Sequence, residues 1–384
     1  MNLQTRLALT LLAVISAGCS APRNPCSEHS LEVSHPAAIG SAVYALLERS
    51  IAEEQDLHVL ALSGGGQNGA YGAGLLKGWR AAGRPSCQLV TGVSTGALIA
   101  TFAFLDSAED DATLERMYTT TTQDDVLRMR TLLGALLSDA LSGSEGMEEL
   151  IARYVSDAVI DRVWKASREG ARLLLVGTTN IEEGGLQLWN MSALARDKRY
   201  GCYRRVLLAS SSIPILFPPV DLGGALHVDG GVRQHVFTPY GLMQARQIAA
   251  LQALALRSGW RGKATVHVVV NSPLRLEPSA VAPSLLDVAE RTIPTLLDSA
   301  LIGDLWRVWA QTQVDQVGFR MNAIPDDMLE AAADSTAFDQ EKMQALFARG
   351  VERGADSTSW ASRPPPPYFS GATTETGLAK RGGN

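Results

Sequence analysis

A serine between two glycines is the residue with the clearest chemical capacity in this chain. Gly92-Val93-Ser94-Thr95-Gly96 has the Gly-x-Ser-x-Gly spacing, with an expected strand before it (88–93) and an expected helix after it (95–105). In that context the flanking glycines allow a tight strand-to-helix turn that exposes the serine oxygen, and the helix directs its first amides toward it. The pattern predicts a nucleophile for acyl transfer, and the alternative is an ordinary tight turn.

A serine hydroxyl is a weak nucleophile and needs a base. The stretch LHVDGGV offers two, because His227 and Asp229 are two residues apart and lie on one face of an expected strand. Asp229-Gly230-Gly231 ends that strand with a turn, where catalytic groups often gather. Either side chain could serve as the base, and Asp229 could also do no more than cap its own turn.

A glycine-rich turn supplies a possible anion site. It follows an expected strand (57–62), and its Gly64-x-Gly66-x-x-Gly69 spacing fits the phosphate turn of a dinucleotide site. A dinucleotide site also needs a carboxylate at the end of the second strand, which here ends Val90-Thr91-Gly92-Val93 without one. The dinucleotide interpretation therefore fails, and the amides of this turn and of Thr95 become the expected donors to an oxyanion.

Strands and helices alternate around these residues, which predicts a parallel sheet with right-handed crossovers. Expected strands cover 57–62, 88–93, 172–180, 186–189, 220–228 and 264–270, and expected helices cover 36–54, 69–82, 95–105, 282–315 and 338–353, with helical patterns throughout 109–168.

Four sequence blocks occur in a specific order. They are GGGQNG (64–69), GVSTG (92–96), ASSSIPILFPPV (209–220) and DGG (229–231), and with them the chain resembles the patatin-like phospholipase family over about residues 57–240. The resemblance implies a three-layer α/β/α fold with a mainly parallel central sheet. It also implies a lipid acyl hydrolase that acts on lipid or phospholipid substrates and needs no metal or other cofactor.

The resemblance also assigns roles to residues. It implies Ser94 as nucleophile and Asp229 as a base that acts without a histidine, because burial in an apolar cleft would raise the pKa of the aspartate. It further implies that Gly64, Gly65 and Gly66 furnish the oxyanion hole, beside the Thr95 amide already expected there, and that Pro214 and Phe217-Pro218 shape the wall near the site. Gly231 stands where many members have alanine. The other motif residues, in the turns, are Gly69, Gly92, Gly96 and Gly230.

Two alternatives stay open. One is a Ser-His-Asp esterase that uses His227, although a His-Asp pair usually comes from different segments of the chain. The other is a non-catalytic envelope lipoprotein that uses the fold for binding. Against the second, a binding protein has no reason to hold nucleophile, base and oxyanion donors together.

The N-terminus predicts export. In MNLQTRLALTLLAVISAGCS, Arg6 precedes an apolar run that ends in small residues before Cys19, as in a cleaved signal. Residues 15–19 resemble the lipobox of bacterial lipoproteins, which implies acylation of Cys19 and a membrane anchor. Ser20, where retention in the inner membrane would favour Asp, points to the outer membrane. The alternative is an ordinary cleaved signal.

Charge and cysteine content limit the partners. A net charge of −6, a pI near 5.6 and the absence of a Lys/Arg cluster argue against nucleic acid. If Cys19 is acylated, Cys26, Cys87 and Cys202 remain, so at most one internal disulfide forms, and their spacing fits no metal site.

The expected organisation has five parts: a lipoprotein signal (1–18), a tether with an N-terminal helix (19–56), the hydrolase domain (57–325), a helical extension (326–362) and a disordered tail (363–384).

Overall fold

A computed structural model describes residues 26, 32–129, 140, 142–275 and 281–366. The expected signal (1–18), Cys19 and most of the expected tail lie outside the described residues.

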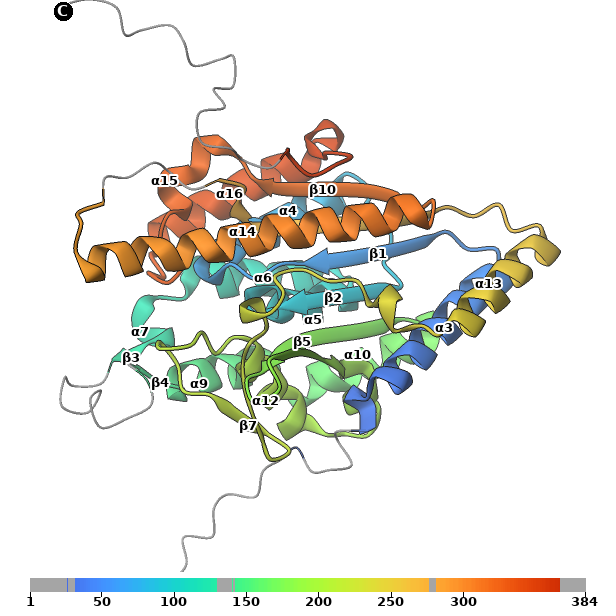
Figure 1. The fold of residues 1–384 in the computed structure, drawn as a ribbon, viewed down its shortest axis with the longest axis horizontal. Coiled ribbons are helices and arrows are strands. Elements are labelled where there is room, and N and C mark those ends of the chain that lie inside the picture. The colour runs from blue at the N-terminus through green and yellow to red at the C-terminus, as the bar shows by residue number, and fades with distance from the viewer. Residues whose placement is uncertain (1–25, 27–31, 130–139, 141, 276–280, 367–384) are drawn as a thin grey trace, which may run out of the picture.

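A mixed sheet of eight strands forms the centre of the described chain (Figure 1). Five strands run parallel in the order β10-β9-β1-β2-β5. β6 and β8 pair antiparallel with β5, and β7 pairs antiparallel with β8. The predicted mainly parallel sheet is confirmed. The strands are β1 (Leu57–Leu62), β2 (Leu89–Val93), β5 (Leu173–Asn180), β6 (Gly185–Asn190), β7 (Val220–Leu222), β8 (Ala225–Asp229), β9 (Ala264–Pro273) and β10 (Gly318–Ile324), and a separate short hairpin pairs β3 (Arg128–Met129) with β4 (Ser142–Gly143).

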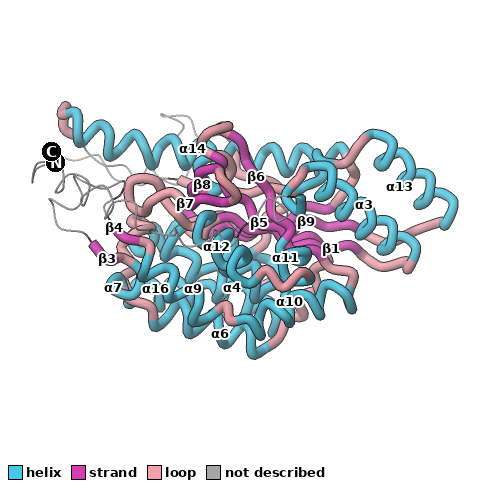
Figure 2. The backbone as a smooth tube through the Cα atoms, turned by 90° about the horizontal axis from the view of Figure 1, so that it is seen from below, coloured by secondary structure: helices cyan, strands magenta, loops and turns pink. Residues whose placement is uncertain are grey.

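Helices cover both faces of this sheet, which gives the three layers that Figure 2 shows edge-on. Alternate residues of β1 enter different cores: Leu60 packs with the layer that contains α4 and α5, and Val59 packs with the layer that contains α3 and α14. Because the strands are buried on both sides, they are apolar without strict alternation.

The first helical layer contains α4 (Gly69–Ala81), α5 (Thr95–Leu105), α6 (Ala108–Thr120), α9 (Glu145–Tyr154), α10 (Asp157–Gly170), α11 (Met191–Arg196), α12 (Tyr200–Ser210) and α16 (Gln340–Ala355). The second contains α3 (Pro36–Ala52) and α14 (Leu285–Val314), with α13 (Ala245–Ser258) packed on α3. Short elements are α7 (Gln123–Val126) and α15 (Leu329–Ala332).

The expected strand 57–62 and the expected helix 95–105 are confirmed to the residue. The sequence did not predict β10, which adds a strand beside β9, nor the helices α11, α12 and α13. No helix within the described ranges combines the length and the apolar character that crossing a bilayer requires.

A disulfide joins Cys26 to Cys202 on α12, and Cys87 is a buried free thiol. The pairing ties the segment before α3 to the helical layer that also carries the pocket described below. By the chain-entropy argument, closing so long a loop stabilises the fold by about 5 kcal/mol.

Candidate active site

Ser94 occupies a strained turn between β2 and α5. Its backbone has φ 56° and ψ −130°, outside the regions that side chains favour. The turn needs its flanking glycines, since a Cβ at Gly92 would lie 2.4 Å from the Gly96 carbonyl oxygen and one at Gly96 would lie 2.5 Å from that of Leu62. The predicted strand-turn-helix around the serine is present.

A buried serine that the sequence analysis did not single out holds this turn. The Ser94 amide donates to Ser210 Oγ at 2.9 Å, and the Ser210 hydroxyl donates to the Gly177 carbonyl at 2.7 Å. Ser210 lies in the 209–220 block, so its motif was visible although its contact was not.

Strands β2 and β8 meet end to end along one edge of β5. Val93, the last residue of β2, pairs with Gly177, and Asp229, the last residue of β8, pairs with Thr178, the next residue of β5. The other edge of β5 is taken by β6 from Leu175 onward. The chain therefore reaches Ser94 and Asp229 at the same level of the sheet, from opposite directions.

The carboxylate of Asp229 is buried, with 6% of the residue exposed. Oδ1 accepts the Gly231 amide at 2.7 Å, whereas Oδ2 has no hydrogen-bond partner among the described residues. Burial raises the pKa of Asp229 to about 6, although the Ser94 hydroxyl and the Gly231 amide each act to lower it. An unpartnered carboxylate oxygen with a raised pKa beside a serine hydroxyl has the properties of a general base.

The glycine turn passes directly against Ser94. A Cβ placed on Gly64 would lie 3.2 Å from the Ser94 Cβ and 3.9 Å from its Oγ. The Gly64 amide points to the His235 carbonyl at 3.4 Å, whereas the amides of Gly65, Gly66 and Thr95 find no acceptor in the described part of the chain. Three of the four expected oxyanion donors are therefore available.

Two segments far away in sequence clamp the glycine turn. On one side, the Asn271 side chain donates to the Ser63 carbonyl at 2.8 Å. On the other, the Gln67 amide donates to the Ser335 carbonyl at 2.8 Å, and Gln67 Oε1 accepts the Asp339 amide at 2.7 Å. Gly65 and Gly66 have φ of 153° and 54°, and a Cβ on either would overlap one of these segments.

The two histidines near Asp229 have other surroundings. His227 Nδ1 lies 2.9 Å from Thr178 Oγ1, and its ring packs edge-on against Trp189. His235, which the sequence analysis did not single out, lies next to Gly231, and its Nε2 is buried without a described partner. Burial lowers the pKa of both imidazoles to about 4, so both are neutral at physiological pH.

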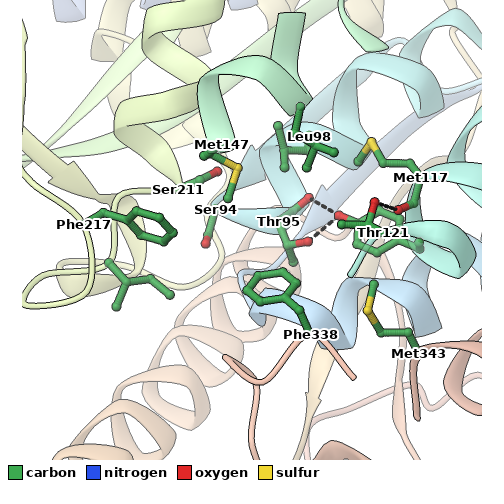
Figure 3. Close-up of a pocket in the computed structure, with 14 residues that line it drawn as sticks. Ser94, Thr95, Leu98, Met117, Thr121, Met147, Ser211, Phe217, Phe338 and Met343 are labelled. Carbon is green, nitrogen blue, oxygen red and sulfur yellow. Dashed lines mark hydrogen bonds between the residues drawn. The ribbon is translucent and has the colours of Figure 1, made fainter. Parts of the chain in front are cut away.

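An apolar pocket opens at Ser94 (Figure 3). Its lining contains Ser94, Thr95 and Gly66, and most of the remaining side chains are apolar, among them Leu98, Met117, Met147, Leu150, Ile213, Phe217, Phe338 and Met343. Phe217 lines it as the family resemblance implied, whereas Pro214 and Pro218 do not. Phe338 and Met343 come from the expected C-terminal extension, which thus forms one wall.

No metal centre is evident in the described ranges, since no three His, Cys, Asp or Glu side chains cluster there in a way that could hold an ion.

Comparisons with known proteins bear on the same span. A family model described as patatin-like phospholipase matches residues 60–240. No curated protein sequence matches the chain. Among solved structures, the crystal structure of VipD from Legionella pneumophila is similar over 77% of this chain and 67% of that chain, with 11% sequence identity and a TM-score of 0.39. The family match contains all four sequence blocks that build the site.

Proposed function

Because the chain carries a patatin-like phospholipase domain over residues 60–240, we propose that it is a serine hydrolase of lipid carboxylic esters in which Ser94 is the nucleophile and Asp229 the base. The observation that carries this proposal is the buried Asp229 Oδ2, which has no described partner and lies beside a serine held in a strained turn.

The reaction follows from the arrangement. Ser94 Oγ attacks the ester carbonyl carbon while Asp229 Oδ2 takes the hydroxyl proton, and the carbonyl oxygen becomes the oxyanion. The amides of Gly65, Gly66 and Thr95 stabilise that charge. Collapse expels the alcohol, which receives the proton from Asp229 and leaves an acyl-serine. Water, deprotonated by Asp229, then attacks the acyl-serine, and the departing Ser94 oxygen regains the proton as the fatty acid is released.

The pocket supports an acyl group as the part of the substrate next to Ser94. Its apolar side chains offer an alkyl chain favourable burial of about 0.8 kcal/mol per methylene. Gly66, Ser94 and Thr95 are the part of the lining where the ester carbonyl would lie. This combination of an apolar lining and one localised polar region matches a lipid ester better than a small polar ester.

The triad alternative has less support. His227 is engaged with Thr178 and Trp189, and no contact of its ring with Ser94 or Asp229 is seen in the described residues. A neutral imidazole with a pKa near 4 is also a weaker base than a carboxylate with a pKa near 6.

We also propose that the protein is exported and anchored through an acylated Cys19. The lipobox-like sequence at 15–19 supports this, as does the Cys26–Cys202 disulfide, because such bonds persist in oxidising compartments. Mass spectrometry of the mature N-terminus should find a diacylglyceryl cysteine that is lost in Cys19→Ser, and an unmodified or differently cleaved terminus would contradict it.

The catalytic proposal is tested with a panel of mixed lipids. Purified protein should release fatty acids, with the matching lyso-lipids, in amounts read by mass spectrometry. The Ser94→Ala and Asp229→Asn variants should each release at least about 10³-fold less fatty acid than wild type. Folded wild-type protein that releases no acyl chain from any lipid would favour the binding-protein alternative.

A further inference from the structure

A second apolar cavity lies directly beyond the pocket at Ser94. Three side chains, those of Leu98, Met117 and Leu150, line both spaces. The rest of the second cavity is formed by Phe102, Ile151, Tyr154 and Val155. Neither the family motifs nor the mechanism above uses this space.

Two helices, α5 and α9, each carry residues that line the first pocket, both spaces and only the second cavity, in that order along the helix. Along α5, Thr95 lines the first pocket, Leu98 lines both and Phe102 lines only the second. At 1.5 Å per residue, Phe102 stands about 10 Å farther along the helix than Thr95.

Along α9 the order repeats, since Met147 lines the first pocket, Leu150 lines both and Ile151 only the second. The two spaces therefore lie in line, and the line starts at Ser94.

The second cavity is narrow. Its lining is apolar apart from the Tyr154 side chain, and it does not admit a water-sized sphere. Atoms around such a void lack contact partners on one side, so an alkyl chain that entered after the wall had moved would gain packing contacts. Entry requires the shared wall to move.

Met117 is the shared residue best suited to move. Its side chain is unbranched and has more freely rotating bonds than a leucine, so it can adopt another rotamer at low cost. The neighbouring Tyr118 hydroxyl is hydrogen-bonded to Thr95 Oγ1, which fixes the backbone of α6 beside the nucleophile while the Met117 side chain faces the cavities. Figure 3 shows Met117 and Leu98 on the side of the pocket away from Phe217.

We propose that the second cavity is the distal part of the acyl-chain site and that Met117 sets the longest chain the enzyme accepts. This inference rests on the proposed function, because it requires the acyl group to be bound at Ser94. The ligand class is an acyl chain long enough to pass Leu98.

The test compares p-nitrophenyl esters with acyl chains of 6 to 16 carbons. Met117→Ala should raise the ratio of long-chain to short-chain kcat/KM by about tenfold over wild type, roughly what burial of two more methylenes would give. Met343→Ala is the matched control, because it removes the same side chain at 1% exposure from the first pocket only. It should affect all chain lengths alike and leave the ratio within about twofold.

Fatty-acid binding to the full chain carrying Ser94→Ala separates this inference from the catalytic proposal. Adding Met117→Ala should tighten binding of hexadecanoate relative to octanoate by about tenfold, whether or not the parent enzyme hydrolyses esters. Leu150→Val, a smaller truncation of the same wall, should shift the preference in the same direction if the alanine variant does not fold. Equal shifts from the Met117 and Met343 variants, or none from Met117→Ala and Leu150→Val, would overturn the assignment.

Discussion

Gly230 lies so close to Gly177 that a Cβ on Gly230 would stand 2.5 Å from the Gly177 carbonyl oxygen. The same Cβ would lie 2.9 Å from a Val93 methyl group, so a side chain there would push the end of β8 away from the end of β2. The absence of a side chain at position 230 allows Asp229, the proposed base, to stand next to Ser94.

Gly230→Ala should therefore lower kcat by at least about 10²-fold. Moving Asp229 by about an ångström relative to Ser94 would cost that much, because the two groups must be held at reacting distance. Gly185→Ala, where a Cβ meets nothing within 4 Å, is the control and should leave kcat unchanged. Steady-state kinetics on a short-chain ester measures both, with circular dichroism to establish folding. Near-normal turnover in folded Gly230→Ala would show that the close approach is not needed.

Ser210→Ala should weaken the turn that presents Ser94. It leaves the Ser94 amide without its acceptor, which costs about 1–3 kcal/mol of folding free energy, and it frees the turn to shift. We expect kcat to fall about 10–100-fold with KM within about threefold. Ser212→Ala removes a buried hydroxyl that, among the described residues, donates to the Leu208 carbonyl, and this variant should lose stability with little change in kcat. The same kinetic loss in both variants would contradict a role for Ser210 in positioning.

The pH dependence of kcat/KM should identify the base. Asp229 must be ionised to accept a proton, and its pKa is about 6, so activity should rise tenfold per pH unit below pH 6 and level off above it. His227→Ala should keep that midpoint, because the imidazole has its own pKa near 4. A wild-type midpoint near 4, or loss of activity in His227→Ala with activity retained in Asp229→Asn, would favour the triad instead.

The folding stability of the protein should also depend on pH through the ionisation of Asp229. Between about pH 4 and pH 6 the unfolded chain loses the Asp229 proton while the folded protein keeps it, so the free energy of unfolding falls as pH rises through this range. Asp229→Asn removes the effect. It should be about 2–3 kcal/mol more stable than wild type at pH 8, with the advantage vanishing near pH 4. Denaturant unfolding at the two pH values measures this, and a difference independent of pH would argue against a raised pKa.

The sequence indicated the parts of the fold whose signals are local. The strand at 57–62 and the helix at 95–105 are long apolar segments next to glycine turns, and both were predicted to the residue. By contrast, β10 (Gly318–Ile324) is an edge strand whose pairing with β9 depends on contacts distant in sequence.

The residues of the candidate site also fall into two groups, those that local motifs predicted and those that only the folded chain brings together. Short motifs pointed to Ser94, Asp229 and the glycine turn, because the turn chemistry requires those residue types. The contacts of Ser210, Asn271 and Phe338 arise only when segments more than a hundred residues apart come together, so no local pattern could reveal them.

The central claim is that Ser94 is an activated nucleophile, and labelling with a fluorophosphonate tests it most directly. Wild-type protein at pH 8 should gain one adduct, located on Ser94 by peptide mass spectrometry. Ser94→Ala should gain none, and Asp229→Asn should react at least about 10²-fold more slowly. Folded wild-type protein that stays unlabelled, or an adduct on another residue, would contradict the account.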